Sequence, residues 1–351
     1  MLFRSVLIEK PLSIIGAGPE QTIVDGTGVD TLSYYGTFRF ENIDGNCTIS
    51  GIRFENPGIY VRPSDSFSAC IFVGWCTGLT SITSCEFRGT LSSDQNWGIY
   101  VSGSNDVIVN NNDFGDLWKP TSVEQCTGEI YMSGNSFHDP VGRLMPNDEI
   151  YPATGVWVQV FNADNTQPVR IEQNTISGTF GEAISMRTRG GYSFTDVEIT
   201  DNTIQLNGTA DPRVGIFLNN DATSQQEAIT GGISAYISGN EIATDNDALA
   251  GIAIVGNNPN CVVTHNLIDN AQSGFVLYPD ASGSGVTIDC VLRANSFVSN
   301  TEAVKNPFDA PLEGLYNWWG TADSHDPALI EATIDGDNVE FRPWLGRDPW
   351  G

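Results

Sequence analysis

An octapeptide of the form VxIxxNxI returns along nearly the whole chain, and this internal repeat limits the fold more than any other feature. In each copy, two apolar residues two positions apart indicate a strand with one buried face, and the asparagine indicates a tight bend. The copies are VIVNNNDF at 107, IYMSGNSF at 130, VRIEQNTI at 169, VEITDNTI at 197, AYISGNEI at 235, CVVTHNLI at 261 and CVLRANSF at 290. The repeat predicts a solenoid of stacked coils.

The asparagine of the repeat defines one column of the predicted solenoid. It falls at Asn112, Asn135, Asn174, Asn202, Asn240, Asn266, Asn295 and Asn317, with Ile52 and Cys85 in its place in two earlier, degenerate copies. Asparagine tolerates the left-handed conformation of a tight bend, and amide side chains stacked coil on coil can hydrogen-bond to one another. We therefore expect an asparagine ladder along one corner, with the asparagines themselves in the left-handed conformation.

A second strand follows most repeats after a variable loop and usually opens with glycine, as in GIYV at 58 and 98, GVWVQV at 155, GIFLN at 215 and GIAIV at 251. Strand, bend, strand and loop then make one coil. The predicted fold is all-β: a single-stranded right-handed parallel β-helix of about ten to eleven coils, roughly 50 Å long. We expect one domain over residues 1–351, with an N-terminal coil at 1–45 that opens in mid-strand and is truncated, repeat coils at 46–314 and a capping segment at 315–351.

The charge of the chain restricts its partners. A formal net charge of -27 opposes binding to a nucleic-acid backbone or an anionic membrane surface, and no run of apolar residues has the length of a membrane span. Such an excess of acidic side chains is typical of three settings: a protein in a high-salt medium, a protein that binds divalent cations, or an extracellular protein whose surface must stay soluble. The sequence leaves these three settings, and the oligomeric state, open.

Seven cysteines without a CxxC pair argue against a zinc site. Cys70 and Cys76 flank a short strand closely enough to bridge if the chain turns back. The alternative is that the cysteines are buried thiols that serve as small apolar residues.

With this repeat, the chain resembles the superfamily of right-handed β-helix proteins that includes pectate lyases, polygalacturonases, alginate lyases and epimerases. The ending, with NWWG at 317–320, an HDP turn at 325–327 and FRPWL at 341–345, resembles that of surface-type or exported β-helix repeat proteins. The resemblance implies an extracellular or cell-surface location and contact with polysaccharide, without implying a reaction. Trp318, Trp319 and Trp344 are expected to cover the last coil, with sugar stacking as the alternative.

The catalytic motifs of these enzymes are incomplete here. RIE at 170–172 is only a fragment of the RIK of polygalacturonases, and the chain lacks their NTD and GHG, a pectate-lyase-like WIDH and an epimerase-like DPH. If the protein is an enzyme, a polysaccharide lyase or glycoside hydrolase is expected. Arg187 is a weak candidate for the base of a lyase, because an arginine resists losing its proton.

Alternation along the second strands turns every other residue outward. The central coils then present five outward residues that combine aromatic surface, charge and amides, which suit sugar hydroxyls and uronate carboxylates. These candidate substrate-binding residues are Trp157, Gln159, Arg187, Phe217 and Asn219. The alternative is a secondary core covered by long loops such as the one from Pro140 to Thr154.

Other polar residues have simpler interpretations. Arg170 and Glu198 occupy equivalent positions in consecutive coils and predict a cross-coil ion pair, while His138 and His265 are expected to be turn residues. The segments NADN at 162, NND at 219 and TDND at 244 concentrate oxygen ligands on loops, so calcium is the one cofactor we consider, with Asx turns as the default.

The leading hypothesis is an exported β-helix that binds a polysaccharide, with uronate-type sugars favoured, on its lateral face. Whether it also cleaves or epimerises the polymer is left open by the sequence. A non-catalytic structural or adhesive cell-surface module is the alternative. A phage tailspike would need a trimerising tail that the sequence does not display.

Overall fold

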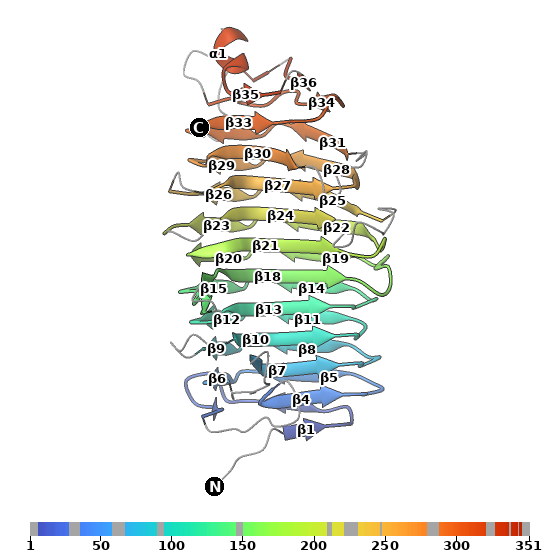
Figure 1. Cartoon of the computed structure of the whole chain (residues 1–351). Helices are drawn as coiled ribbons and strands as arrows, with labels where there is room; N and C mark the ends of the chain where they lie inside the picture. Colours follow the sequence, from blue (N-terminus) through green and yellow to red (C-terminus); the bar gives the residue numbers. More distant parts are fainter. Residues whose placement is uncertain are drawn as a thin grey trace.

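The computed structural model describes residues 6–27, 36–57, 67–89, 95–144, 150–208, 213–220, 231–245, 248–278, 288–320, 327–336, 338–342 and 344–345. Three long parallel sheets stack into a rod, with the N-terminal coil at one end and α1 (Pro327–Glu331) at the other (Figure 1). This is the predicted all-β parallel solenoid.

Sheets I and II take one strand from each coil, and sheet III takes one from each of the first ten coils. Sheet I contains β1 (Val6–Ile8), β4 (Phe38–Glu41), β7 (Phe67–Gly74), β10 (Gln95–Ser102), β13 (Lys119–Glu124), β18 (Ala153–Val160), β21 (Phe180–Thr188), β24 (Val214–Asn220), β27 (Ala250–Gly256), β30 (Ser273–Tyr278), β33 (Glu302–Lys305) and β35 (Ile334–Asp335). Sheet II contains β2 (Ser13–Ile15), β5 (Cys47–Ser50), β8 (Thr80–Thr83), β11 (Val107–Asn110), β14 (Ile130–Ser133), β19 (Val169–Glu172), β22 (Phe194–Thr200), β25 (Ile233–Ser238), β28 (Asn258–Thr264), β31 (Ile288–Arg293), β34 (Leu312–Glu313) and β36 (Val339–Glu340).

Sheet III is made of short strands: β3 (Ile23–Asp25), β6 (Arg53–Glu55), β9 (Glu86–Arg88), β12 (Asp113–Gly115), β15 (Ser136–His138), β20 (Thr175–Gly178), β23 (Thr203–Leu206), β26 (Glu241–Ala243), β29 (Leu267–Asp269) and β32 (Ser296–Val298). A small antiparallel hairpin, β16 (Arg143–Leu144) and β17 (Ile150–Tyr151), stands outside the coils.

Two details of the predicted coil need correction. A coil has three strands rather than two, because the end of the octapeptide, after the asparagine, forms a strand of its own in sheet III. Sheets I and II have 12 strands each, more than the predicted ten to eleven coils. The difference arises at the C-terminal end, where β33 to β36 lack the octapeptide and β35 and β36 lie within the predicted capping segment.

The asparagine ladder is confirmed. The side-chain Oδ1 of Asn202 accepts hydrogen bonds from the backbone N and Nδ2 of Asn174, both at 3.0 Å, and Asn240 does the same for Asn202. The pattern runs without interruption from Asn112 to Asn317 and begins at Cys85, whose backbone N donates to Asn112. Every bend thus satisfies its buried polar groups through the next coil.

The conformation predicted for these bends was wrong in one respect. The residue in the left-handed conformation is the one before the asparagine, as at Gln173, Asp201 and His265 with φ of 55°, 54° and 53°. The asparagine itself is buried and points its amide inward along the stack. The position before it carries the strain of the turn and faces outward, which explains its variable residue type.

Replacing Asn202 by Ala tests the ladder. The substitution would leave the backbone N of Asn174 without its acceptor and would remove one of two hydrogen bonds from each of Asn174 Nδ2 and Asn240 Oδ1, and buried unpaired groups are costly. We expect the free energy of unfolding in urea to fall by about 1–3 kcal/mol. An unchanged value would contradict a structural role for the ladder.

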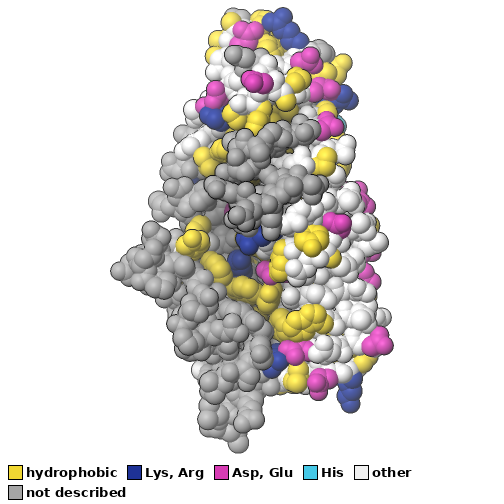
Figure 2. Space-filling view, turned by 45° about the vertical axis from the view of Figure 1, so that its right-hand side comes forward, with side chains coloured by type: hydrophobic (Ala, Val, Ile, Leu, Met, Phe, Trp, Pro, Cys, Tyr) yellow, Lys and Arg dark blue, Asp and Glu magenta, His cyan; other side chains and the backbone are white. Residues whose placement is uncertain are grey.

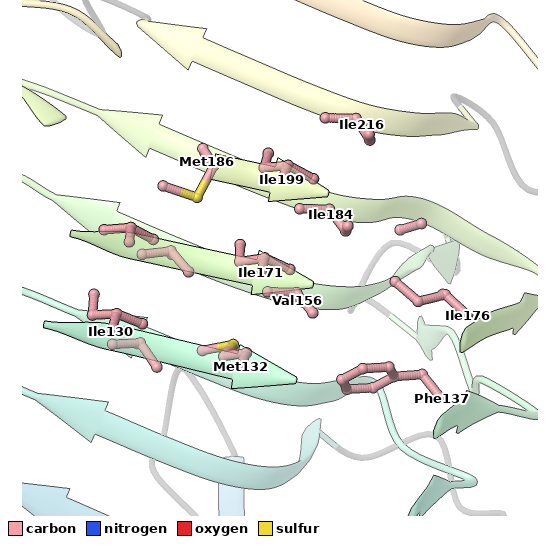
Figure 3. Close-up of a cluster of buried hydrophobic side chains, with 14 of the residues drawn as sticks. Ile130, Met132, Phe137, Val156, Ile171, Ile176, Ile184, Met186, Ile199 and Ile216 are labelled. Atoms are coloured by element: carbon pink, nitrogen blue, oxygen red, sulfur yellow. The ribbon is translucent and has the colours of Figure 1, made fainter. Parts of the chain in front are cut away.

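Aliphatic side chains from all three sheets fill the interior of the coils (Figure 3). On sheet III four phenylalanines form a continuous stack, with ring centroids of Phe87 and Phe114 4.8 Å apart and those of Phe114 and Phe137 4.9 Å apart. The cysteines belong to this core, because all seven are buried and free. The alternative of a bridge between Cys70 and Cys76 is therefore not realised, and burial raises the pKa of the Cys126 thiol to about 12.

The C-terminal end is covered by aromatic residues, as expected. Trp319 is 2% exposed and stacks on Phe297 of the last sheet III strand at 5.5 Å. Phe341 meets the edge of Trp319 and Trp344 packs beside Phe341, while Trp318 is half-buried. Of the HDP turn, residues 325 and 326 lie outside the described ranges.

Candidate functional site

The outer face of sheet I carries the candidate site. Strand register places seven outward residues in one column, Tyr100, Ser122, Trp157, Ser185, Phe217, Ala253 and Val276, and seven in a second, Ser102, Glu124, Gln159, Arg187, Asn219, Val255 and Tyr278. The five predicted residues therefore lie on three adjacent strands, β18, β21 and β24. The predicted strand GIYV at 58 lies outside the described residues.

Direct contacts join the predicted residues. The guanidinium carbon of Arg187 lies 4.3 Å from the ring centroid of Trp157 and 5.3 Å from that of Phe217. Its Nε donates to Ser185 Oγ at 3.1 Å, and its Nη2 pairs with Glu182 at 2.5 Å. The aromatic residues thus hold Arg187 in a fixed position on this face.

Lys119 is the most unusual group of the site. Its side chain is buried, and its Nζ lies 3.6 Å from the ring centroid of Trp157, 4.9 Å from that of Trp118 and 5.5 Å from that of Trp97. Burial lowers the pKa of Lys119 to about 8, an effect that Glu124 and Glu182 oppose. A cation enclosed by indole faces is stabilised by the ring quadrupoles, so Lys119 carries its charge at neutral pH.

Two carboxylates accompany these cations. Glu124 accepts hydrogen bonds from the hydroxyls of Ser122 and Tyr100, both at 3.2 Å. Glu182 accepts a hydrogen bond from Nη2 of Arg187 through its Oε1. In the space-filling view, Lys and Arg side chains lie beside an Asp or Glu side chain and a band of hydrophobic side chains on one side of the rod (Figure 2).

Four buried polar atoms on this face have no hydrogen-bond partner within the described part of the chain. They are Trp157 Nε1, Gln159 Nε2, Glu182 Oε2 and Asn219 Oδ1. Folded proteins satisfy the great majority of their buried polar atoms. The group thus contains two unpaired donors and two unpaired acceptors on three neighbouring strands.

The opposite half of the face is apolar. Val214, Ala250, Ala253 and Val276 form a buried cluster against which Phe217 and Tyr278 pack. A small secondary core thus exists over β24 to β30, whereas the charged groups and three of the four unpartnered atoms lie on β13 to β21. Next to them, the chain after β17 approaches the site, because Trp118 Nε1 donates to Pro152 O at 3.1 Å.

Strict alternation failed to place Lys119 and Glu182 on this face. Gly155, Gly215 and their equivalents also point inward, since a Cβ there would come within 4 Å of the core residues Ile176 and Ile242. Two consecutive inward positions turn the residue before them outward, and register aligns Trp97 with Lys119, and Thr154 with Glu182. Glycine marks this position in β10 and β18, but β13 and β21 carry Pro120 and Ala183 there, so the sequence of these two strands held no such signal.

The remaining predicted residues are structural. Arg170 pairs with Glu198 across coils at 3.0 Å, as predicted, and also with Asp196 at 3.0 Å. His265 is a turn residue of the ladder, but His138 ends strand β15, with its ring nitrogens 3.1 Å from Asp113 and 2.8 Å from Asp139. The expectation of a turn is therefore wrong for His138.

Calcium is not identified by the described residues. Within the ranges given above, His, Cys, Asp and Glu form no group of three or more that could hold a metal ion. In NADN, Asn165 accepts a hydrogen bond from Gln167 N, as in an Asx turn, whereas Asp164 accepts one from Ser193 N of the next coil. Parts of NND and TDND lie outside the described residues.

Comparison with known proteins identifies the family. The model described as "Right handed beta helix region" matches residues 40–230 and 149–323. The chain therefore belongs to the right-handed β-helix family. No curated protein matches the sequence.

Similar solved structures include tailspike proteins. The Dettilon tailspike protein has a TM-score of 0.59 and 14% identity, covering 97% of this chain and 61% of its own. A mutant tailspike protein of E. coli bacteriophage HK620 in complex with pentasaccharide has a TM-score of 0.45 and 12% identity, covering 88% and 60%. The chain thus spans about three fifths of these tailspikes, and the likeness concerns the fold. No helix in the described ranges is long and apolar enough to cross a bilayer.

Proposed function

We propose that this protein binds a linear polysaccharide on the outer face of sheet I, between β13 and β24. The observation that carries the proposal is the set of unpartnered buried atoms, Trp157 Nε1, Gln159 Nε2, Glu182 Oε2 and Asn219 Oδ1. Sugar hydroxyls both donate and accept hydrogen bonds, so one oligosaccharide can satisfy all four. An extracellular or cell-surface location belongs to the same proposal and suits the acidic surface.

Acidic sugars of the uronate type fit the site best. The chain has 16 basic residues against 43 acidic ones, yet Lys119 and Arg187 meet on the ring of Trp157. A carboxylate bound there gains charge-assisted hydrogen bonds. Neutral sugars would form no ion pair with Lys119 or Arg187.

Cleavage of the bound chain by β-elimination is a second candidate function. Lys119 suits the base better than Arg187, because the pKa of Lys119 is lowered to about 8 while an arginine stays protonated. The neutral amine would take the proton from C5 of a uronate, a C4–C5 double bond would form, and the C4–O bond would break, with the leaving oxygen taking a proton from water. Unsaturated uronate absorbance during incubation measures this reaction, and its rate should rise with pH through about 8.

Affinity electrophoresis with Gln159→Met tests binding. The protein is run in gels that contain polygalacturonate, alginate or neutral dextran, each with and without calcium. We expect a gel with an acidic polymer to retain the unmodified protein. Methionine has nearly the shape of glutamine but lacks the amide, so retention should be lost. The melting temperature should stay the same or rise, because a buried unpartnered group disappears.

The matched control is Gln205→Met, which changes an exposed glutamine of β23 on sheet III. This variant should be retained like the unmodified protein. Equal retention of Gln159→Met would move binding away from this face. Failure of every polymer to retain the unmodified protein would instead favour a structural or adhesive module, and retention only with calcium would revive a calcium site.

A further inference from the structure

Trp75 presents an indole to solvent at the edge of the same face. It is 55% exposed, and among the described tryptophans no other belongs to the exposed class. Its backbone adopts φ of 54°, the left-handed conformation that Asn42 and Gln125 share at the equivalent positions of this corner. The bend of the coil therefore sets the backbone of Trp75, and the feature that points to function is the exposed indole.

The neighbouring coil is shaped to receive this indole. Gly103 occupies the next position along the same corner, and a Cβ there would lie 2.8 Å from Cδ1 of Trp75 and 3.0 Å from its Nε1. Any other residue at 103 would displace the ring. The ring of Phe72 also supports it, edge-on, at 6.3 Å between centroids. The indole is therefore fixed in place while more than half of the residue's surface stays accessible.

Aromatic contacts connect Trp75 to the proposed binding surface. Phe72 lies 5.5 Å from Tyr100, and Tyr100 lies 4.3 Å from Trp97 of the Lys119 enclosure. Gly74, the residue before Trp75, is in register with Gln159. The two residues are three strands apart, with Ser102 and Glu124 at the positions between them. At about 4.8 Å per strand, Trp75 is displaced by roughly 14 Å along the rod from Gln159.

We propose that Trp75 is a stacking platform for a further pyranose of the same polysaccharide, which runs parallel to the rod axis across the strands. This inference rests on the proposed function. The flat C–H surface of a pyranose suits an open indole face, and the separation of Trp75 from Gln159 exceeds the size of one sugar. The ligand recognised is accordingly an oligosaccharide of several residues.

Oligogalacturonates and oligomannuronates of increasing length, from dimers to octamers, test this by titration. Affinity should rise with length until the chain reaches Trp75. Trp75→Ala should weaken the longest oligomers about tenfold and leave the dimers unchanged, and Trp75→Phe should restore most of the difference. Tyr236→Ala, which removes a 42% exposed aromatic residue of sheet II, is the matched control and should change nothing.

The outcomes separate the two proposals. If Gln159→Met abolishes binding at every length while Trp75→Ala leaves the length dependence unaltered, the platform is overturned and the binding surface stands. If Gln159→Met binds oligomers of all lengths normally, both the proposed function and the stacking platform are overturned. An equal loss for dimers and octamers in Trp75→Ala would also overturn the platform, since it would indicate a general disturbance of the fold.

Discussion

Replacing Phe114 by Ala should lower the free energy of unfolding by about 3–5 kcal/mol. The ring is fully buried in sheet III, stacked between Phe87 and Phe137 with interplanar angles of 7° and 4°. Alanine would remove the buried apolar surface, leave a cavity that the two flanking coils cannot close, and break two aromatic contacts at once. Urea denaturation followed by circular dichroism measures the loss.

Phe114→Leu is the appropriate comparison, because leucine refills most of the cavity and loses only the aromatic contacts. Its cost should be about 1–2 kcal/mol, clearly below that of alanine. A loss of less than about 1 kcal/mol for Phe114→Ala would mean that the coils collapse around the missing ring. In that case the phenylalanine stack would not be a principal source of stability.

The second large effect concerns pH. Affinity for an acidic polysaccharide should fall at least tenfold as the pH rises from about 7 to about 9.5, because Lys119, with its pKa of about 8, loses its charge. The groups that act on it are Glu124 of β13, Glu182 and Arg187 of β21, and Arg189. Titration calorimetry at several pH values measures the affinity.

Stability should change in the opposite direction over the same range. The folded pKa of Lys119 is depressed below its ordinary value of 10.5, so above about pH 8 the unfolded chain binds a proton that the folded protein has lost. The free energy of unfolding therefore gains a contribution as pH rises from about 8 toward 10.5. Lys119→Met should remove this contribution and the pH dependence of binding, whereas Lys10→Met, at an exposed position, should keep both.

The pH experiment has clear contrary outcomes. An affinity that is constant between about pH 7 and 9.5 would exclude Lys119 as the group that attracts the polysaccharide. An unchanged affinity in Lys119→Met at neutral pH would do the same. If the three indoles stabilise the charged form of Lys119 more strongly, its pKa will be higher. The changes in affinity and in the free energy of unfolding will then both occur at a higher pH.

The sequence by itself determined the solenoid, the ladder and two of the outward columns. Each depends on short-range spacing: apolar residues two apart turn one face inward, and one asparagine per copy marks the same corner in every coil. Stacking then aligns equivalent positions, which is why Trp157, Arg187 and Phe217 meet as predicted. The last coils were not predicted because they lack the octapeptide. The strands of sheet III were not predicted because only their first two residues belong to the octapeptide, too few to show a period.

Only the tertiary structure decided the chemistry of the face. Pro120 and Ala183 are buried at the positions where other strands carry the opening glycine, and this break in the alternation places Lys119 and Glu182 outside the core. The three indoles around Lys119 come from three successive coils of unequal length, so no fixed spacing in the sequence brings them together. Likewise, whether Gln159 and Asn219 have partners depends on what each neighbouring coil offers, and that is set by packing across coils rather than by local pattern.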